Sequence, residues 1–130
     1  MNIEERKQRG AELINKMLGE ESAESVRESW TEISPDFENY VVEFLGGEIW
    51  SREGLDLRTK SLVTIATLAG MGRRRALELN IRFAIRNGAT KQDVTETLLQ
   101  IAPYAGFPAT WEGLATAHEV FQEEGATGES

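Results

Sequence analysis

The chain has 130 residues, of which 40% are hydrophobic, and its formal net charge is −8 at pH 7. This length suits one ordinary domain, and the apolar fraction is enough for a buried core and excludes a largely disordered chain. The acidic balance is the opposite of that expected for a nucleic-acid-binding protein. The longest apolar run, in Leu62–Met71, is far shorter than the roughly 20 residues that cross a bilayer, so no membrane association is predicted.

The residue types that are missing also limit the chemistry. The sequence has no cysteine, which excludes disulfides, thiolate nucleophiles and cysteine-based metal sites. His118 is its single histidine, so one chain cannot form a histidine metal cage, and no metal site is predicted. The opening Met1 to Lys7 is polar and lacks the apolar core of a secretory signal, which favours a cytoplasmic protein.

Apolar residues recur at helical spacing along most of the chain, and no segment alternates with the period of two that a strand requires. We therefore predict an all-α bundle of about six to seven helices. We expect a single domain over residues 1–124 and a flexible tail over residues 125–130. The predicted helices cover residues 3–18, 22–33, 35–45, 57–71, 73–86, 91 to about 104, and 108 to about 124.

Several helix ends carry recognisable capping residues. Ser34 precedes Pro35, a favoured first helical residue. Asp56 is suited to cap the helix that follows it, and Thr90 with Asp93 forms the pattern of a capping box. The segment from Glu48 to Gly54 is expected to be irregular or a single turn. Because the helix over residues 57–71 is apolar or small on all sides from residue 62 onward, we expect it to be central and buried.

A basic cluster interrupts the acidic surface. It contains the run Arg73-Arg74-Arg75, together with Arg82 and Arg86. One interpretation is a solvated helix face. The other is a local attractor for an anionic ligand, which the negative net charge does not exclude because the field near a cleft is set locally.

Three segments read in order carry a family resemblance. They are Gly47-Glu48-Ile49-Trp50-Ser51-Arg52, then Leu55–Arg73, then Arg86–Pro108 with its Tyr-Ala-Gly-Phe-Pro turn. Together they resemble the gamma-carboxymuconolactone decarboxylase branch of the carboxymuconolactone decarboxylase family, over about Arg9 to Phe121.

The resemblance implies the all-helical fold shared with alkyl hydroperoxidase-like proteins, assembled as a homo-oligomer, typically a hexamer, or a trimer or dimer. It also implies a pocket near the helix over residues 73–86 and a small anionic lactone or carboxylate as ligand. The implied reaction is the decarboxylation of a carboxylated lactone in aromatic catabolism, on the route to beta-ketoadipate, without metal or organic cofactor.

Four positions distinguish this chain from the peroxidase branch of the family. The peroxidase branch has two cysteines where this chain has Arg73 and Ala76, a histidine at Asn80 and a glutamate at Ser61. Peroxidase chemistry needs a thiolate, so that activity is rejected. The decarboxylase branch also lacks the cysteines but normally keeps the histidine, so Asn80 is a replacement of the family's signature residue.

Decarboxylation requires groups that hold carboxylates, because the reacting carboxylate must be oriented. Arginine forks onto carboxylates, which makes Arg52, Arg58 and Arg82 candidates. Arg58 lies in the first turn of its helix, where the dipole disfavours a cation and an anionic partner is expected. Trp50, Trp111 and Glu112 complete the predicted substrate-binding set, although packing is the simpler role for the tryptophans and an exposed surface the simpler one for the glutamate.

The reaction also needs donors for an enolate-like charge and an acid that returns a proton. Asn80 and Tyr104 are candidate donors, but an asparagine cannot transfer a proton. Glu48, Tyr104 and His118 are the candidate acids, with Glu112 a further possibility. The alternatives are an exposed turn carboxylate for Glu48, a core aromatic for Tyr104, and a packed core residue for His118.

Three functions follow from these observations. The first is decarboxylation of carboxymuconolactone itself. The second is a diverged family enzyme with another substrate or reaction, such as isomerisation or lactone processing. The third is a non-catalytic member that binds a ligand.

Overall fold

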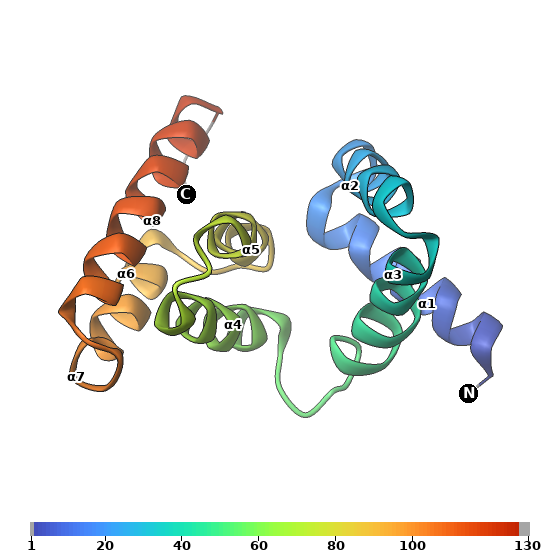
Figure 1. The fold of residues 1–130 in the computed structure, drawn as a ribbon, viewed down its shortest axis with the longest axis horizontal. Helices are drawn as coiled ribbons and strands as arrows, with labels where there is room; N and C mark the ends of the chain where they lie inside the picture. The colour runs from blue at the N-terminus through green and yellow to red at the C-terminus, as the bar shows by residue number, and fades with distance from the viewer. Residues whose placement is uncertain (1, 128–130) are drawn as a thin grey trace. The chain divides into compact units, whose positions relative to one another are not determined.

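The computed structural model describes residues 2–127, and within them every regular element is helical (Figure 1). The predicted all-α class is therefore confirmed. The helices separate into two compact units, Met1–Leu55 and Asp56–Ser130. The single domain predicted over residues 1–124 stays a prediction. Among the described residues, no helix combines the length and the apolar character needed to cross a membrane.

The first unit contains four helical elements: α1 (Ile3–Leu18), α2 (Glu20–Ile33), α3 (Pro35–Tyr40) and η1 (Val41–Ile49). The Asn2 side chain accepts a hydrogen bond from the backbone N–H of Glu5 and so caps α1. Gly19 adopts a φ of 83° between α1 and α2, a conformation that favours glycine. Ser34 caps α3 through the N–H of Phe37, as its sequence pattern predicts.

The element η1 is a π-helix, which packs directly against α1. The two backbones approach so closely that a Cβ at Gly10 would lie 1.7 Å from the carbonyl oxygen of Val42. A Cβ at Gly47 would lie 2.2 Å from the carbonyl oxygen of Arg6. Glycines on both helices are thus required for this contact, which holds the first unit together.

The second unit contains α4 (Leu57–Met71), α5 (Arg74–Arg86), α6 (Lys91–Gln100), α7 (Ala102–Ala105) and α8 (Phe107–Thr127). Asp56 caps α4 by accepting the N–H of Thr59, and Thr90 with Asp93 forms the predicted capping box of α6. The core lies where α4, α5, α6 and α8 meet, and its fully buried large side chains are Ile65, Ile81, Val94, Leu98 and Val120.

Some predicted boundaries were wrong. The helix expected over residues 35–45 is α-helical only to Tyr40, and the chain continues as the π-helix η1 to Ile49. Gly46 and Gly47 lie within this π-helix and do not end it. Part of the segment from Glu48 to Gly54 is therefore helical. The predicted second and last helices begin earlier than expected, and α8 continues to Thr127. Residues 128–130 of the predicted tail lie outside the described residues.

The expectation that α4 is buried on all sides was also wrong. Only Ser61, Ile65 and Ala69 of this helix are buried, whereas Val63 is 54% exposed and Met71 is 60% exposed. The described residues of the chain cover only part of the apolar surface of α4. Composition alone could not distinguish a helix buried on all sides from one with an uncovered apolar face.

The close approach of α1 and η1 predicts that Gly10→Ala destabilises the protein. The added methyl group would overlap a backbone carbonyl, which cannot move without shifting a helix, so we expect a loss of about 3 kcal/mol in unfolding free energy. Gly54→Ala is the matched control, because a Cβ there meets nothing within 4 Å. Urea unfolding of the two variants measures the difference, and equal stability of both would contradict this packing.

Candidate active site

A small pocket lies where the loop between α4 and α5 meets α8. Gly72 ends α4 in the left-handed conformation with a φ of 71°, and its N–H donates to the carbonyl of Ala69. The backbone N–H of Arg73 donates to the carbonyl of Leu68 at 2.9 Å. This turn places two arginines at the pocket, and its lining residues are Ala69, Gly72, Arg73, Arg74, Leu77, Ala109, Glu112, Gly113 and Thr116.

The pocket combines an apolar interior with charged groups. Leu77 and Thr116 are buried, and the Thr116 hydroxyl donates to the carbonyl of Glu112 at 2.9 Å. Arg73, Arg74 and Glu112 are exposed. The space that water molecules can occupy is only about 20 Å³, which is room for about one water. A carboxylate ligand would therefore bind at the charged opening of the pocket and not deep inside it.

Arg58 is paired within the second unit. Its guanidinium forms a two-pronged contact with Asp93, at 2.6 Å from Nη2 to Oδ1 and at 3.0 Å from Nε to Oδ2. Asp93 also accepts the backbone N–H of Thr90 at 2.9 Å. The hydrogen bond from Arg58, followed by that from Thr90, lowers the pKa of Asp93 to about 2. The anionic partner expected for Arg58 is thus present in the chain itself.

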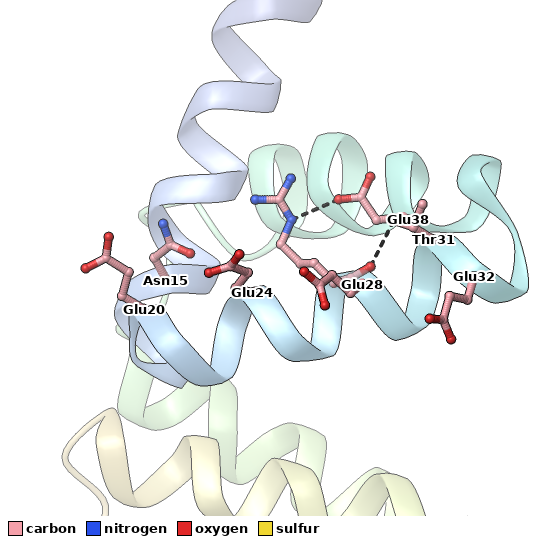
Figure 2. Close-up of a pocket in the computed structure, with 8 residues that line it drawn as sticks. Asn15, Glu20, Glu24, Glu28, Thr31, Glu32 and Glu38 are labelled. Carbon is pink, nitrogen blue, oxygen red and sulfur yellow. Dashed lines mark hydrogen bonds and ion pairs between the residues drawn. The ribbon is translucent and has the colours of Figure 1, made fainter.

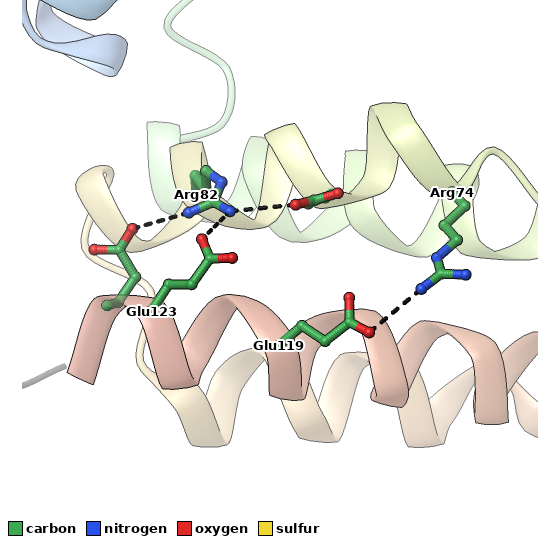
Figure 3. Close-up of polar contacts among 6 residues, drawn as sticks. Arg74, Arg82, Glu119 and Glu123 are labelled. Carbon is green, nitrogen blue, oxygen red and sulfur yellow. Dashed lines mark hydrogen bonds and ion pairs between the residues drawn. The ribbon is translucent and has the colours of Figure 1, made fainter. Parts of the chain in front are cut away.

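Arg82 lies in a cluster of carboxylates between α5 and α8 (Figure 3). It contacts Glu78 at 3.2 Å and Glu124 at 3.6 Å, and it forms a further ion pair with Glu123. Burial opposes its charge, but the hydrogen bonds with Glu123 and Glu78 outweigh that effect and raise the pKa of Arg82. The arginine therefore ties the two helices together in the described structure.

Asn80 is partly buried on α5, and its Nδ2 donates to the carbonyl of Ala76 at 2.8 Å. Seven residues later, the C-cap residue Asn87 contacts another helix instead, because its Nδ2 donates to the buried hydroxyl of Ser61 at 2.9 Å. The Asn80 amide nitrogen carries two N–H groups, and the helix backbone accepts one of them.

Three other predicted residues of the second unit are exposed. Tyr104 on α7 is 84% exposed and Trp111 on α8 is 77% exposed. His118 lies on the same exposed side of α8 as Trp111, seven residues later. The interpretations of Tyr104 and His118 as core residues, and of Trp111 as a packing residue, were therefore wrong for the described chain. The buried side of α8 instead carries small residues and Val120, which the core needs for close packing.

The remaining predicted residues belong to the first unit. Glu48 is paired with Arg6, with 3.6 Å between Oε2 and Nη1. Trp50 is partly buried, and Arg52 is exposed. The same unit carries a second, larger groove of about 570 Å³ along α2 (Figure 2). Its walls carry five glutamates, and its one arginine, Arg27, is paired with Glu38 at 2.8 Å, so this groove would repel an anionic ligand.

Comparison with known proteins identifies the family. The model of the carboxymuconolactone decarboxylase family matches residues 35–119. A 4-carboxymuconolactone decarboxylase from Acinetobacter baylyi is 39% identical over 125 residues, which cover 96% of this chain and 93% of that protein. The chain belongs to the carboxymuconolactone decarboxylase family. The resemblance inferred from the three sequence segments is therefore confirmed.

The chain is also similar to two further proteins. A nitrosuccinic acid decarboxylase from Metarhizium robertsii is 28% identical over 114 residues, or 88% of this chain and 80% of that protein. An uncharacterized 15.0 kDa protein from Paracoccus denitrificans is 36% identical over 86 residues, or 65% of this chain and 64% of that protein.

For this member of the carboxymuconolactone decarboxylase family, the structure brings only Glu112 of the predicted site residues to the pocket between α4, α5 and α8. Arg73 and Arg74 are not among the site residues that the sequence predicted. The signal was present in the basic run over residues 73–75, but its two interpretations could not be separated without the position of α8. The assigned roles of all ten predicted site residues stay predictions.

The paired state of Asp93 predicts a pH-dependent stability. Its pKa is lowered on folding from an ordinary value of about 3.9 to about 2. The stabilisation is therefore present above about pH 4 and is lost as the pH falls toward 2. We expect Asp93→Asn to have a lower urea midpoint than the native protein at pH 7, and the gap to narrow as the pH is lowered from 5 toward 2.

Glu96→Gln is the control for this measurement, because Glu96 is exposed on the same helix. That variant should follow the native protein at every pH. A gap between native protein and Asp93→Asn that is the same at pH 7 and pH 3 would show that the charge of Asp93 is not responsible.

Proposed function

We propose that this protein is a decarboxylase that acts on a carboxylated lactone similar to carboxymuconolactone. The observation that carries the proposal is the 39% identity with the Acinetobacter baylyi 4-carboxymuconolactone decarboxylase along nearly the full length of both chains. The pocket supports it, because two arginines lie at its opening, and a guanidinium group can form a forked contact with a carboxylate.

Decarboxylation requires three kinds of group from the protein. A cation holds the carboxylate, a hydrogen-bond donor stabilises the enolate-like charge that forms as carbon dioxide leaves, and an acid returns a proton to the carbon. Asn80 is our candidate for the donor. For the acid, the candidates are Glu48, Tyr104 and His118, of which the exposed Tyr104 and His118 can exchange protons with solvent. Glu112 is a further candidate because it lines the pocket.

The proposal extends to the setting of the reaction. We infer a role in aromatic catabolism toward beta-ketoadipate, without metal or organic cofactor, in a cytoplasmic homo-oligomer. A hexamer is the assembly that the family suggests. The exposed aromatic side chains of α7 and α8 support an assembly, because large apolar side chains in contact with water favour burial between subunits.

A second candidate is decarboxylation of a different carboxylate. It is favoured by the Metarhizium robertsii relative, whose name gives nitrosuccinic acid as its substrate and which covers most of the chain. Asn80 is consistent with it, because loss of a proton-transferring side chain at the family's histidine position would accompany a change in chemistry. In both candidates the bond that breaks joins a carboxylate carbon to its neighbour.

The direct test is to incubate the purified protein with gamma-carboxymuconolactone and to follow carbon dioxide release. The native protein is expected to turn over. Asn80→His should change the rate by about tenfold or more, because it introduces an acid with a pKa near neutrality at the position where the resemblance implies a histidine. Asn39→His, at an exposed position on α3, should leave the rate unchanged.

Three outcomes are informative. Turnover by the native protein supports the first candidate and directs the search for the acid to the residues named above. Turnover only after Asn80→His would contradict the first candidate and support the diverged enzyme, with the scaffold intact. No turnover by either protein would contradict carboxymuconolactone as the substrate.

A further inference from the structure

The ion pairs of its arginine side chains limit which of them can bind the carboxylate of a ligand. In the described part of the chain, the guanidinium of Arg58 is held by Asp93 and that of Arg82 by three glutamates. Either side chain would have to give up ion pairs that link helices before it could bind a ligand. A substrate bound at either arginine would therefore displace a contact between two helices.

Arg73 differs from Arg58 and Arg82 in its side-chain contacts. Its side chain lines the pocket between α4, α5 and α8 and has no ion pair or hydrogen bond with any described residue. Its neighbour Arg74 also lines the pocket but reaches Glu119 on α8, at 3.4 Å (Figure 3). A guanidinium that is exposed, unpaired and next to an apolar pocket can form a forked contact with a carboxylate without breaking an existing interaction.

The positive charge of the residues that follow Arg73 also favours the binding of an anion there. Three consecutive arginines begin at residue 73, in a chain whose net charge is −8. They stand at the start of α5, where the helix dipole makes a cation unfavourable. All three are exposed, so burial of their side chains does not explain the arrangement. The resulting positive potential would draw an anion to the opening of the pocket.

We infer that Arg73 is the residue that binds the carboxylate of the substrate. The inference rests on the proposed function for the chemical class of the ligand. Arg74 adds positive charge beside it. Glu112 lies on the α8 side of the pocket, so the part of the ligand that faces α8 carries a neutral or hydrogen-bond-donating group and not a second unprotonated carboxylate.

The test measures binding and turnover separately. Citrate serves as the carboxylate probe in calorimetric titrations at low ionic strength. Arg73→Gln removes one positive charge from the pocket, and Arg75→Gln removes the same charge two residues away, at an exposed position that does not line it. We expect the dissociation constant of citrate to rise about 10- to 100-fold in Arg73→Gln and less than about threefold in Arg75→Gln.

Arg73→Lys distinguishes a forked contact from simple charge attraction, and it should lie between the native protein and Arg73→Gln. With gamma-carboxymuconolactone, Arg73→Gln should raise KM by a similar factor. Equal weakening of citrate binding by Arg73→Gln and Arg75→Gln, or no measurable binding of citrate to the native protein, would overturn the inference.

The two proposals can fail independently. Citrate binding that depends on Arg73, in a protein that releases no carbon dioxide, would support the inference and contradict the proposed reaction. Carbon dioxide release with the same KM in Arg73→Gln and Arg75→Gln would support the reaction and contradict the role of Arg73.

Discussion

The contact between Arg58 and Asp93 joins the first turn of α4 to the first turn of α6. Asp93 also closes the capping box of α6, so one carboxylate stabilises a helix start and ties it to a second helix. In the same unit, Arg82 connects α5 to α8 through its glutamate partners (Figure 3). These pairs connect helices that the buried apolar core packs together, and they also determine which cations remain available to an anionic ligand.

Close packing sets the place of the pocket. The left-handed turn at Gly72 brings the start of α5 back against α4, and α8 approaches α6 so closely that a Cβ at Gly113 would lie 3.0 Å from Leu98. The buried hydroxyl of Thr110 donates to the carbonyl of Leu98, so this approach leaves no polar atom of that side chain unsatisfied. The same contacts keep the pocket interior narrow and place its charged groups at the opening.

Local sequence patterns predicted the helices well, because capping depends on neighbours in the chain. Asp56, Ser34 and the pair of Thr90 and Asp93 all cap the helices assigned to them. The π-helical turn was missed because a glycine pair usually ends a helix, whereas here Gly47 is needed where η1 meets α1. That requirement comes from a partner helix more than thirty residues away in sequence and leaves no local trace.

The candidate site was harder to predict for the same reason. Arginine was the correct residue type to consider, but the choice among arginines depends on which carboxylates reach them in space. Asp93 lies 35 residues after Arg58, and Glu123 lies 41 residues after Arg82. Family resemblance identified the fold and the family, while the pairing of individual side chains required the structure.

A crystal structure of the protein with bound citrate tests the central claim most directly. The account predicts a citrate carboxylate within hydrogen-bond distance of the Arg73 guanidinium, with the pairs of Arg58 with Asp93 and of Arg82 with its glutamates intact. A carboxylate bound instead to Arg58 or Arg82, with those pairs broken and Arg73 in solvent, would contradict it.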